Sequence, residues 1–181
     1  SGITGTAGCT RAAGETVLGS PYLITCAPGT LASPNDNFQT GTTANFTITP
    51  AATTTTITNA AALTSTPTIL GQTYAVNWAT LPVAPSAGVP AGTVTVTDGT
   101  DTCTAAVGAG TCNLTSTTFG VKNITATYGG DANMTGSVSQ TVQHSVQIGI
   151  AGNVKQFGTN ANVAGVTITL TGSAAGATVT D

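Results

Sequence analysis

Charged side chains are scarce in this sequence. Only 5% of its 181 residues are Asp, Glu, Lys or Arg, where about a quarter is ordinary for a soluble domain. Three basic residues against six acidic ones give a net charge of −3, and the basic residues form no cluster that would neutralise phosphate groups. We therefore predict that the protein does not bind nucleic acid.

Long apolar runs are missing as well. No stretch approaches the roughly 18 consecutive apolar residues that a membrane-spanning helix needs. We therefore predict no membrane insertion for this chain.

Side chains that carry catalysis are few. The only histidine, His144, has no carboxylate and no second histidine close to it in the sequence. A catalytic triad needs a nucleophile, a base and a residue that orients the base, and the spacing identifies none of these. We predict that His144 is a structural residue, that the protein is not an enzyme and that it uses no cofactor.

The sequence holds four widely spaced cysteines, namely Cys9, Cys26, Cys103 and Cys112. A zinc site needs close pairs such as C-x-x-C together with soft partner ligands, which are absent here. We therefore predict that the four cysteines form disulfides, which persist in oxidising compartments. That prediction places the protein in the periplasm, on the cell surface or outside the cell, and we expect the extracellular or cell-surface location.

Threonine is abundant where charge is scarce, at about one residue in four or five. Its β-branched side chain fits a pleated strand and presents a hydroxyl to solvent. No window sustains apolar residues at helical spacing, because Gly, Pro or Thr interrupts every candidate. The sequence predicts an all-β protein with essentially no helix.

The clearest strand pattern lies between residues 91 and 130. Apolar residues alternate with threonine in GTVTVTDG and again in NITATYGG, which is the period of a half-buried strand. Cys103 and Cys112 flank Val107-Gly108 symmetrically. A two-residue turn there would put the two cysteines opposite each other on the neighbouring strands of a hairpin, close enough for a disulfide. We expect a local disulfide clamp on that hairpin.

Residues 53–146 carry roughly seven strands, the number in an immunoglobulin-like sandwich, and we expect Trp78 in its core. The stretches ATTTTIT, LGQTYAVNWAT, PAGTVTVTDG and VKNITATYGGDANMTGSVSQTV lie within residues 53–143. They resemble strands A, B, C and F to G of bacterial Ig-like repeat domains. The resemblance implies a complete sandwich that serves as a spacer or stalk module.

Residues 1–52 show only three or four strands, among them YLITC and ANFTIT, too few to close a sandwich. The elements AGCTRAAGETVLGSPYLITCAPGTL and FTITPA resemble the C-terminal half of the MBG-type β-domains of bacterial surface proteins. The resemblance implies an incomplete Ig-like β-module.

Residues 147–181 form a strand-rich tail in which VAGVTITLTGS alternates apolar residues with threonine. The pattern I-x-G-x-V followed by A-G-V-T-I-T-L-T-G resembles the opening strands of carboxypeptidase-regulatory-like and SdrD-type B modules. The resemblance implies a second partial module. The predicted fold is thus a series of immunoglobulin-like β-sandwich modules in tandem.

The two partial modules suggest how copies of the chain would associate. Unpaired strand edges are templates for association, and the two partial modules together amount to one ordinary Ig-sized module. We expect the tail of one subunit to complete the head of the next by donor-strand complementation. Repeating this head-to-tail contact adds subunits without closing them into a ring. The residues expected at this contact are Val166, Ile168 and Leu170 in the tail and Phe46 and Ile48 in the head. The product would be a homopolymer, namely an extracellular filament or pilus-like appendage.

Two alternatives remain open at the level of the sequence. The two partial modules could pair within one chain. The chain could also be the stalk or binding segment of a tandem-repeat cell-surface adhesin, with a host or surface ligand on loops such as residues 81–90.

Two weaker hypotheses concern polar side chains. Asp98, Asp101 and Asp131 could meet at one end of the sandwich as a Ca²⁺ site, although an ordinary turn explains Asp98-Gly99 equally well. Four N-x-S/T sequons are candidates for glycosylation, about as many as chance gives in a threonine-rich chain. Their acceptors are Asn45, Asn113, Asn123 and Asn133.

Overall fold

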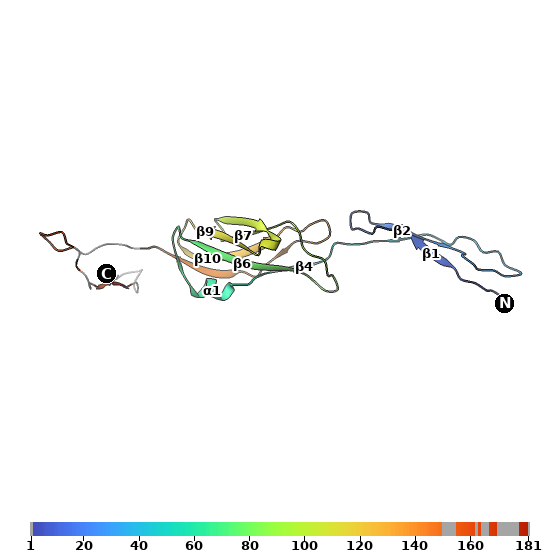
Figure 1. The fold of residues 1–181 in the computed structure, drawn as a ribbon, viewed down its shortest axis with the longest axis horizontal. Coiled ribbons are helices and arrows are strands. Elements are labelled where there is room, and N and C mark those ends of the chain that lie inside the picture. The colour runs from blue at the N-terminus through green and yellow to red at the C-terminus, as the bar shows by residue number, and fades with distance from the viewer. Residues whose placement is uncertain (1, 150–154, 162, 164–166, 170–177, 181) are drawn as a thin grey trace. The chain divides into compact units, whose positions relative to one another are not determined.

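The computed structural model describes residues 2–149, 155–161, 163, 167–169 and 178–180. The chain divides into two compact units, Ser1–Gln147 and Ile148–Asp181. The described residues form mostly β-strands in several sheets, with one short α-helix (Figure 1), so the predicted all-β fold class is confirmed. No helix among them is long and apolar enough to cross a membrane.

The first three strands form an antiparallel sheet of their own. Its order is β1 (Gly8–Arg11), β2 (Tyr22–Ala27) and β3 (Ala44–Phe46). Aromatic and β-branched residues in YLITCA favour the central strand. Among residues 2–50 only Tyr22 is buried, so this sheet lacks a hydrophobic core of its own.

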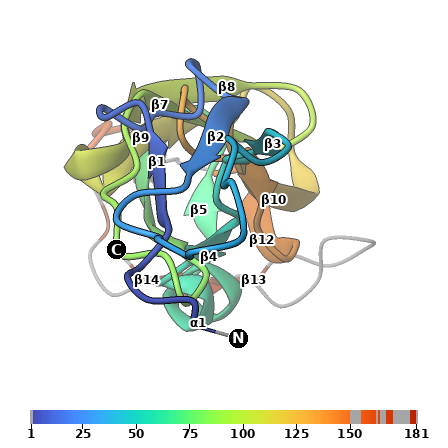
Figure 2. The ribbon, with the colours of Figure 1, turned by 90° about the vertical axis from the view of Figure 1, so that its right-hand side faces the viewer.

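The residues from Thr53 to Gln147 fold into a sandwich of two sheets. One sheet has the order β4 (Thr53–Ile57), β6 (Thr73–Pro82), β9 (Thr111–Thr115). The other has the order β5 (Thr68–Ile69), β12 (Val142–Gln147), β10 (Gly120–Tyr128), β7 (Thr93–Thr97), β8 (Thr102–Ala106), and β11 (Ser137–Val138) also pairs with β10. Strands β10 and β12 lie side by side in Figure 2. Neighbours pair antiparallel except β5 with β12, which pair parallel.

The alternation of apolar residues with threonine puts one face of each strand into the space between the sheets. Val94 and Val96 of β7 are buried there, and Trp78 of β6 is a core residue, as predicted. The core consists of Ile57, Leu63, Tyr74, Val76, Trp78, Val94, Val96, Leu114, Ile124, Ala126, Tyr128 and Met134.

Helix α1 (Ala60–Ser65) is an element that the sequence did not predict. It lies on the outer side of the sandwich and packs against β12 (Figure 1). A helix of six residues gains little from propensity alone. Its order comes from Leu63, which is buried in the core.

The predicted hairpin between Cys103 and Cys112 is wrong. Cys103 lies in β8 opposite Val96 of β7, whereas Cys112 lies in β9 opposite Val76 of β6, so the two cysteines belong to different sheets. The chain crosses between the sheets through a 3₁₀ turn, η1 (Val107–Ala109). The period of two shows which face of a strand is buried but not which sheet the strand joins, and both cysteines face the core.

Candidate functional site

The N-terminal sheet has one apolar face. The register places Tyr22 opposite Phe46 and Cys26 opposite Cys9, so these side chains share a face with Ile24. Phe46 is 43% exposed, and of the five only Tyr22 is buried. Because a sheet normally buries its apolar face against another element, this face is a candidate site for association.

Two interactions hold the strands of this sheet together. A disulfide joins Cys9 and Cys26, which lie directly opposite each other on β1 and β2. The guanidinium of Arg11 lies 5.1 Å from the centre of the Phe46 ring and forms an ion pair with Glu15. The Arg11 side chain therefore shields part of an otherwise exposed aromatic ring.

The residues predicted for assembly fall at different places in the structure. Phe46 ends β3, an edge strand, and Ile48 follows it, half-buried, with its N–H donating to Ser20 Oγ at 2.8 Å. In the tail, Ile168 lies in β13 (Thr167–Thr169), which pairs antiparallel with β14 (Thr178–Thr180). Val166 and Leu170 lie outside the described residues.

A buried hydrogen-bonded network lies at the end of β7. Asp98 is 4% exposed, and its Oδ2 accepts a hydrogen bond of 2.5 Å from Ser116 Oγ, which in turn lies 2.9 Å from the hydroxyl oxygen of Tyr74. Oδ1 accepts hydrogen bonds from the backbone N–H groups of Thr100 and Asp101, which closes the turn. The network thus joins a loop of one sheet to Tyr74 of the other.

Two opposing effects set the charge state of Asp98. Burial acts to raise the pKa of this carboxyl, but the hydrogen bonds from Ser116, Asp101 and Thr100, with the positive charge of Lys122, outweigh burial and hold the pKa below its usual value. Lys122 is itself only 7% exposed, and its Nζ donates to Thr118 Oγ1. The sequence signals the turn through Asp98-Gly99, but Ser116 and Lys122 carry no such signal because both lie far from Asp98 in the chain.

His144 is buried in the Ig-like domain, with a partner at each ring nitrogen. The residue is 2% exposed, and its ring packs against that of Tyr74 with 4.3 Å between ring centres and a tilt of 36° between the ring planes. Nδ1 lies 2.8 Å from the carbonyl oxygen of Leu63, so Nδ1 carries the hydrogen, and Nε2 lies 2.8 Å from Thr68 Oγ1. In a catalytic triad a carboxylate orients the histidine ring and a serine hydroxyl bonds to it. Here the carbonyl of Leu63 orients the ring, and the hydroxyl of Ser116 bonds to Asp98 and Tyr74.

The three acids considered for calcium do not come together. Asp98 and Asp101 lie in the turn after β7, whereas Asp131 follows β10, and these two strands run antiparallel, so the acids lie at opposite ends of the pair. Asp131 accepts hydrogen bonds from the Ala91 N–H and the Tyr128 hydroxyl at 2.8 and 2.9 Å. Across the part of the chain that the structure describes, no group of three potential ligands forms a metal site.

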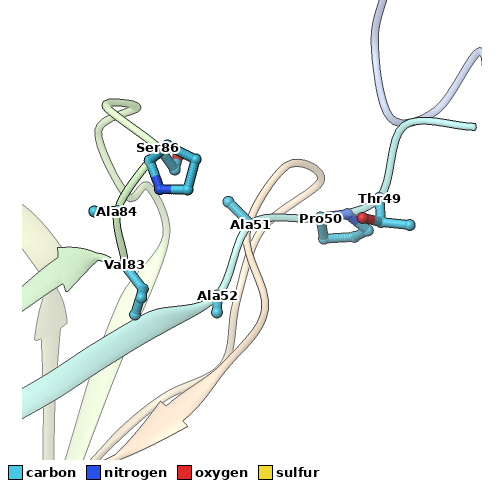
Figure 3. A pocket seen from close by; sticks show the side chains of 8 residues that line it. Thr49, Pro50, Ala51, Ala52, Val83, Ala84 and Ser86 are labelled. Carbon is cyan, nitrogen blue, oxygen red and sulfur yellow. The ribbon is translucent and has the colours of Figure 1, made fainter.

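The loop at residues 81–90, considered as a ligand site, borders a shallow hollow of about 370 Å³ (Figure 3). Its lining residues are small or apolar, with no charged and no aromatic side chain: Thr49, Pro50, Ala51, Ala52, Val83, Ala84, Pro85 and Ser86. The hollow therefore lacks the aromatic and charged groups that usually fix a ligand.

The two-sheet arrangement agrees with a comparison against known families. Residues 61–147, from α1 to the end of β12, match the family model of the bacterial Ig-like domain (group 3). This chain contains a bacterial Ig-like domain. Comparison with curated proteins and with solved structures gave no match.

The Ig-like domain and the two disulfides are consistent with the predicted surface or secreted location. Domains of this family are typical of surface proteins. The resemblances of residues 1–52 to MBG-type domains and of the tail to SdrD-type B modules stay predictions, as do the domain boundaries at residues 52 and 146.

The four sequon acceptors are all exposed: Asn45, Asn113, Asn123 and Asn133. Asn113 and Asn123 lie on the outer faces of β9 and β10 in the Ig-like domain. Exposure leaves room for a glycan at each site, and their glycosylation stays a prediction.

Proposed function

We propose that this protein is a structural subunit of an extracellular filament or surface appendage, assembled from copies of itself. In this proposal strand complementation joins residues 147–181 of one copy to the N-terminal module of the next, and the Ig-like domain is the spacer between two such joints. The observation that carries the proposal is the apolar face of the sheet β1–β2–β3, on which Phe46 is 43% exposed and only Tyr22 is buried.

Such a face favours an added strand for a physical reason. A three-stranded sheet without a second layer is marginally stable by itself, and it gains stability when a further strand covers apolar side chains or extends an edge. Both outer strands, β1 and β3, have one edge without a strand partner among the described residues. The tail offers an alternating apolar segment around Ile168 that matches the period of a strand.

The predicted contact is heterologous, because the tail surface differs from the head surface. A heterologous contact whose rotation does not close builds an open fibre rather than a ring. The tail and the head then act as complementary halves of one joint.

A second candidate function is a stalk or binding segment of a tandem-repeat adhesin. The observation in its favour is the pairing of β13 with β14, because a strand already paired in a hairpin has only one edge left for a partner. The two functions differ in the oligomeric state that each requires.

Analytical ultracentrifugation and negative-stain electron microscopy of the full chain over a range of concentrations test the proposal. The wild-type chain is expected to form oligomers that lengthen with concentration, whereas Ile168→Asp stays monomeric because the aspartate cannot enter an apolar joint. Val89→Asp is the matched control, since Val89 is 87% exposed on a loop remote from the tail in sequence. A wild-type chain that stays monomeric at every concentration overturns filament assembly and leaves the adhesin segment.

A further inference from the structure

Strand β3 forms one outer edge of the N-terminal sheet. It pairs with β2 on one side, and on its other side it has no strand partner among the described residues. Its three residues, Ala44, Asn45 and Phe46, are all exposed. The strand therefore offers its unpaired backbone groups to a further strand.

The hydrogen bonds of this segment show which backbone groups face the open edge. The register of β2 and β3, continued beyond Phe46, puts Ile48 opposite Ser20, and the Ile48 N–H donates to Ser20 Oγ at 2.8 Å, toward the β2 side. Along an antiparallel edge strand, successive residues direct their N–H and C=O groups alternately toward the partner strand and away from it. Asn45 and Thr47 therefore direct theirs to the open edge, and Phe46 lies between them.

The opposite edge of the same sheet, formed by β1, is guarded by a charge. Arg11 of β1 lies opposite Ile24, so it shares the apolar face of the sheet with that residue. A charged side chain on the apolar face of an edge strand is one of the devices that prevent further pairing. Residues 38–49, which contain β3, include no charged residue and no proline. The edge at β3 is thus the better acceptor of the two.

The tail holds a strand with a complementary need. Strand β13 pairs with β14 on one side only among the described residues, and a two-stranded hairpin is marginally stable by itself. Residues 163–172, which contain β13, also include no charged residue and no proline. Pairing β13 with β3 would join a two-stranded and a three-stranded sheet into one sheet of five strands.

We propose that β13 of a neighbouring copy pairs along the open edge of β3, with Ile168 opposite Phe46. The inference rests on the proposed function and names the edge of the head at which complementation occurs. Because Phe46 directs its backbone groups to β2, it forms a non-hydrogen-bonded pair with a strand on its other side, and side chains approach most closely in such pairs. An aromatic residue opposite a β-branched one is a favourable cross-strand pair. Asn45 and Thr47 supply the backbone hydrogen bonds.

Amide hydrogen exchange, read residue by residue by NMR, tests the assignment without altering the head. The wild-type assembly is compared with the Ile168→Asp chain, which keeps the same N-terminal sheet. We expect the N–H groups of Asn45 and Thr47 to exchange about a hundredfold more slowly in the assembly, because pairing takes them out of contact with water. Equal exchange of these two groups in both samples overturns the pairing at β3.

Thr47→Pro removes one N–H group at the open edge and leaves the bonds between β3 and β2 in place. Ala7→Pro is the matched control at the β1 edge. Thr4 and Thr6 bond toward residues 30–32, so the alternation directs the Ala7 N–H away from β2. Each variant thus deletes one outward donor from an outer strand of the same sheet.

Analytical ultracentrifugation of the full-length variants compares the two edges. We expect Thr47→Pro to raise the dissociation constant between subunits about tenfold or more, and Ala7→Pro to associate like wild type. If Thr47→Pro assembles as well as wild type, or if Ala7→Pro weakens assembly equally, the assignment to β3 is overturned while strand complementation stands. A wild-type chain that stays monomeric at every concentration overturns the proposed function, and the pairing at β3 with it.

Discussion

The disulfide between Cys103 and Cys112 joins the two sheets of the Ig-like domain, with 6.0 Å between the two Cα atoms. Cys103 lies in β8 and Cys112 in β9, and both strands lie at the edges of their sheets. The bond therefore closes one open side of the sandwich beside the apolar core. It restrains the unfolded chain across a short loop and holds the two edge strands together in the folded state.

Replacing both residues, Cys103→Ala with Cys112→Ala, is expected to lower the free energy of unfolding by about 2–3 kcal/mol, because the short loop limits the entropy that the bond removes from the unfolded chain. Urea denaturation followed by the fluorescence of Trp78, the single tryptophan, measures the change. The pair Cys9→Ala with Cys26→Ala is the control, since that bond lies in the separate N-terminal sheet. Equal shifts of the Trp78 transition in both double variants would contradict this account.

Ser116→Ala is expected to lower the free energy of unfolding at neutral pH by about 1–3 kcal/mol, because it leaves buried Asp98 without one of its donors. The pKa of Asp98 is lower in the folded state than in the unfolded chain, where an aspartate titrates near about 4. Its hydrogen bonds therefore stabilise the fold above that pH, and the contribution is lost as the pH falls through the folded-state pKa.

The difference in unfolding free energy between wild type and Ser116→Ala should thus shrink as the pH drops below about 4. Urea titrations of both proteins from pH 7 to pH 2 or so give that difference at each pH. A constant difference across the whole range would show that Ser116 contributes nothing through the charge of Asp98.

Gly130→Ala is expected to destabilise the Ig-like domain by about 2 kcal/mol or more. Gly130 has a φ of +87°, and an added Cβ would lie 2.8 Å from the carbonyl oxygen of Met134. The neighbouring Gly129 offers a matched control, because an added Cβ there meets no atom within 4 Å. Thermal unfolding followed by circular dichroism compares the two, and equal melting temperatures would refute the steric argument.

The disulfide between Cys9 and Cys26 is expected to maintain the N-terminal sheet, because residues 2–50 bury only Tyr22. In the double variant Cys9→Ala, Cys26→Ala, amide hydrogen exchange in β2 should become much faster, while exchange in β10 stays as in wild type. Unchanged protection of β2 would mean that the backbone ladder alone holds the sheet.

Local patterns in the sequence predicted the strands well. Alternation of apolar residues with threonine located β7 and β10, the segments YLITC and QTYAVNWATL were recognised as the strands β2 and β6, and the expected sandwich placed Trp78 in the core. Pairing between distant segments could not be deduced in this way. At η1 the chain crosses from one sheet to the other, so that Cys103 and Cys112 lie in different sheets. This crossing depends on which sheet has a free edge for each strand.

The buried polar side chains were hidden for a related reason. Asp98 meets Ser116 across 18 positions, and His144 meets Leu63 across 81, so no local motif marks either contact. The helix α1 depends likewise on the burial of Leu63 against the core and not on a helical pattern of its own.

Mixing two variants with complementary defects tests the proposed assembly most directly. Phe46→Asp damages the head and keeps the tail, whereas Ile168→Asp damages the tail and keeps the head. Each alone should be monomeric, and a mixture should form a one-to-one dimer in analytical ultracentrifugation, because one intact tail meets one intact head and the chain of contacts stops there. A mixture that stays monomeric while the wild-type chain polymerises would contradict head-to-tail complementation.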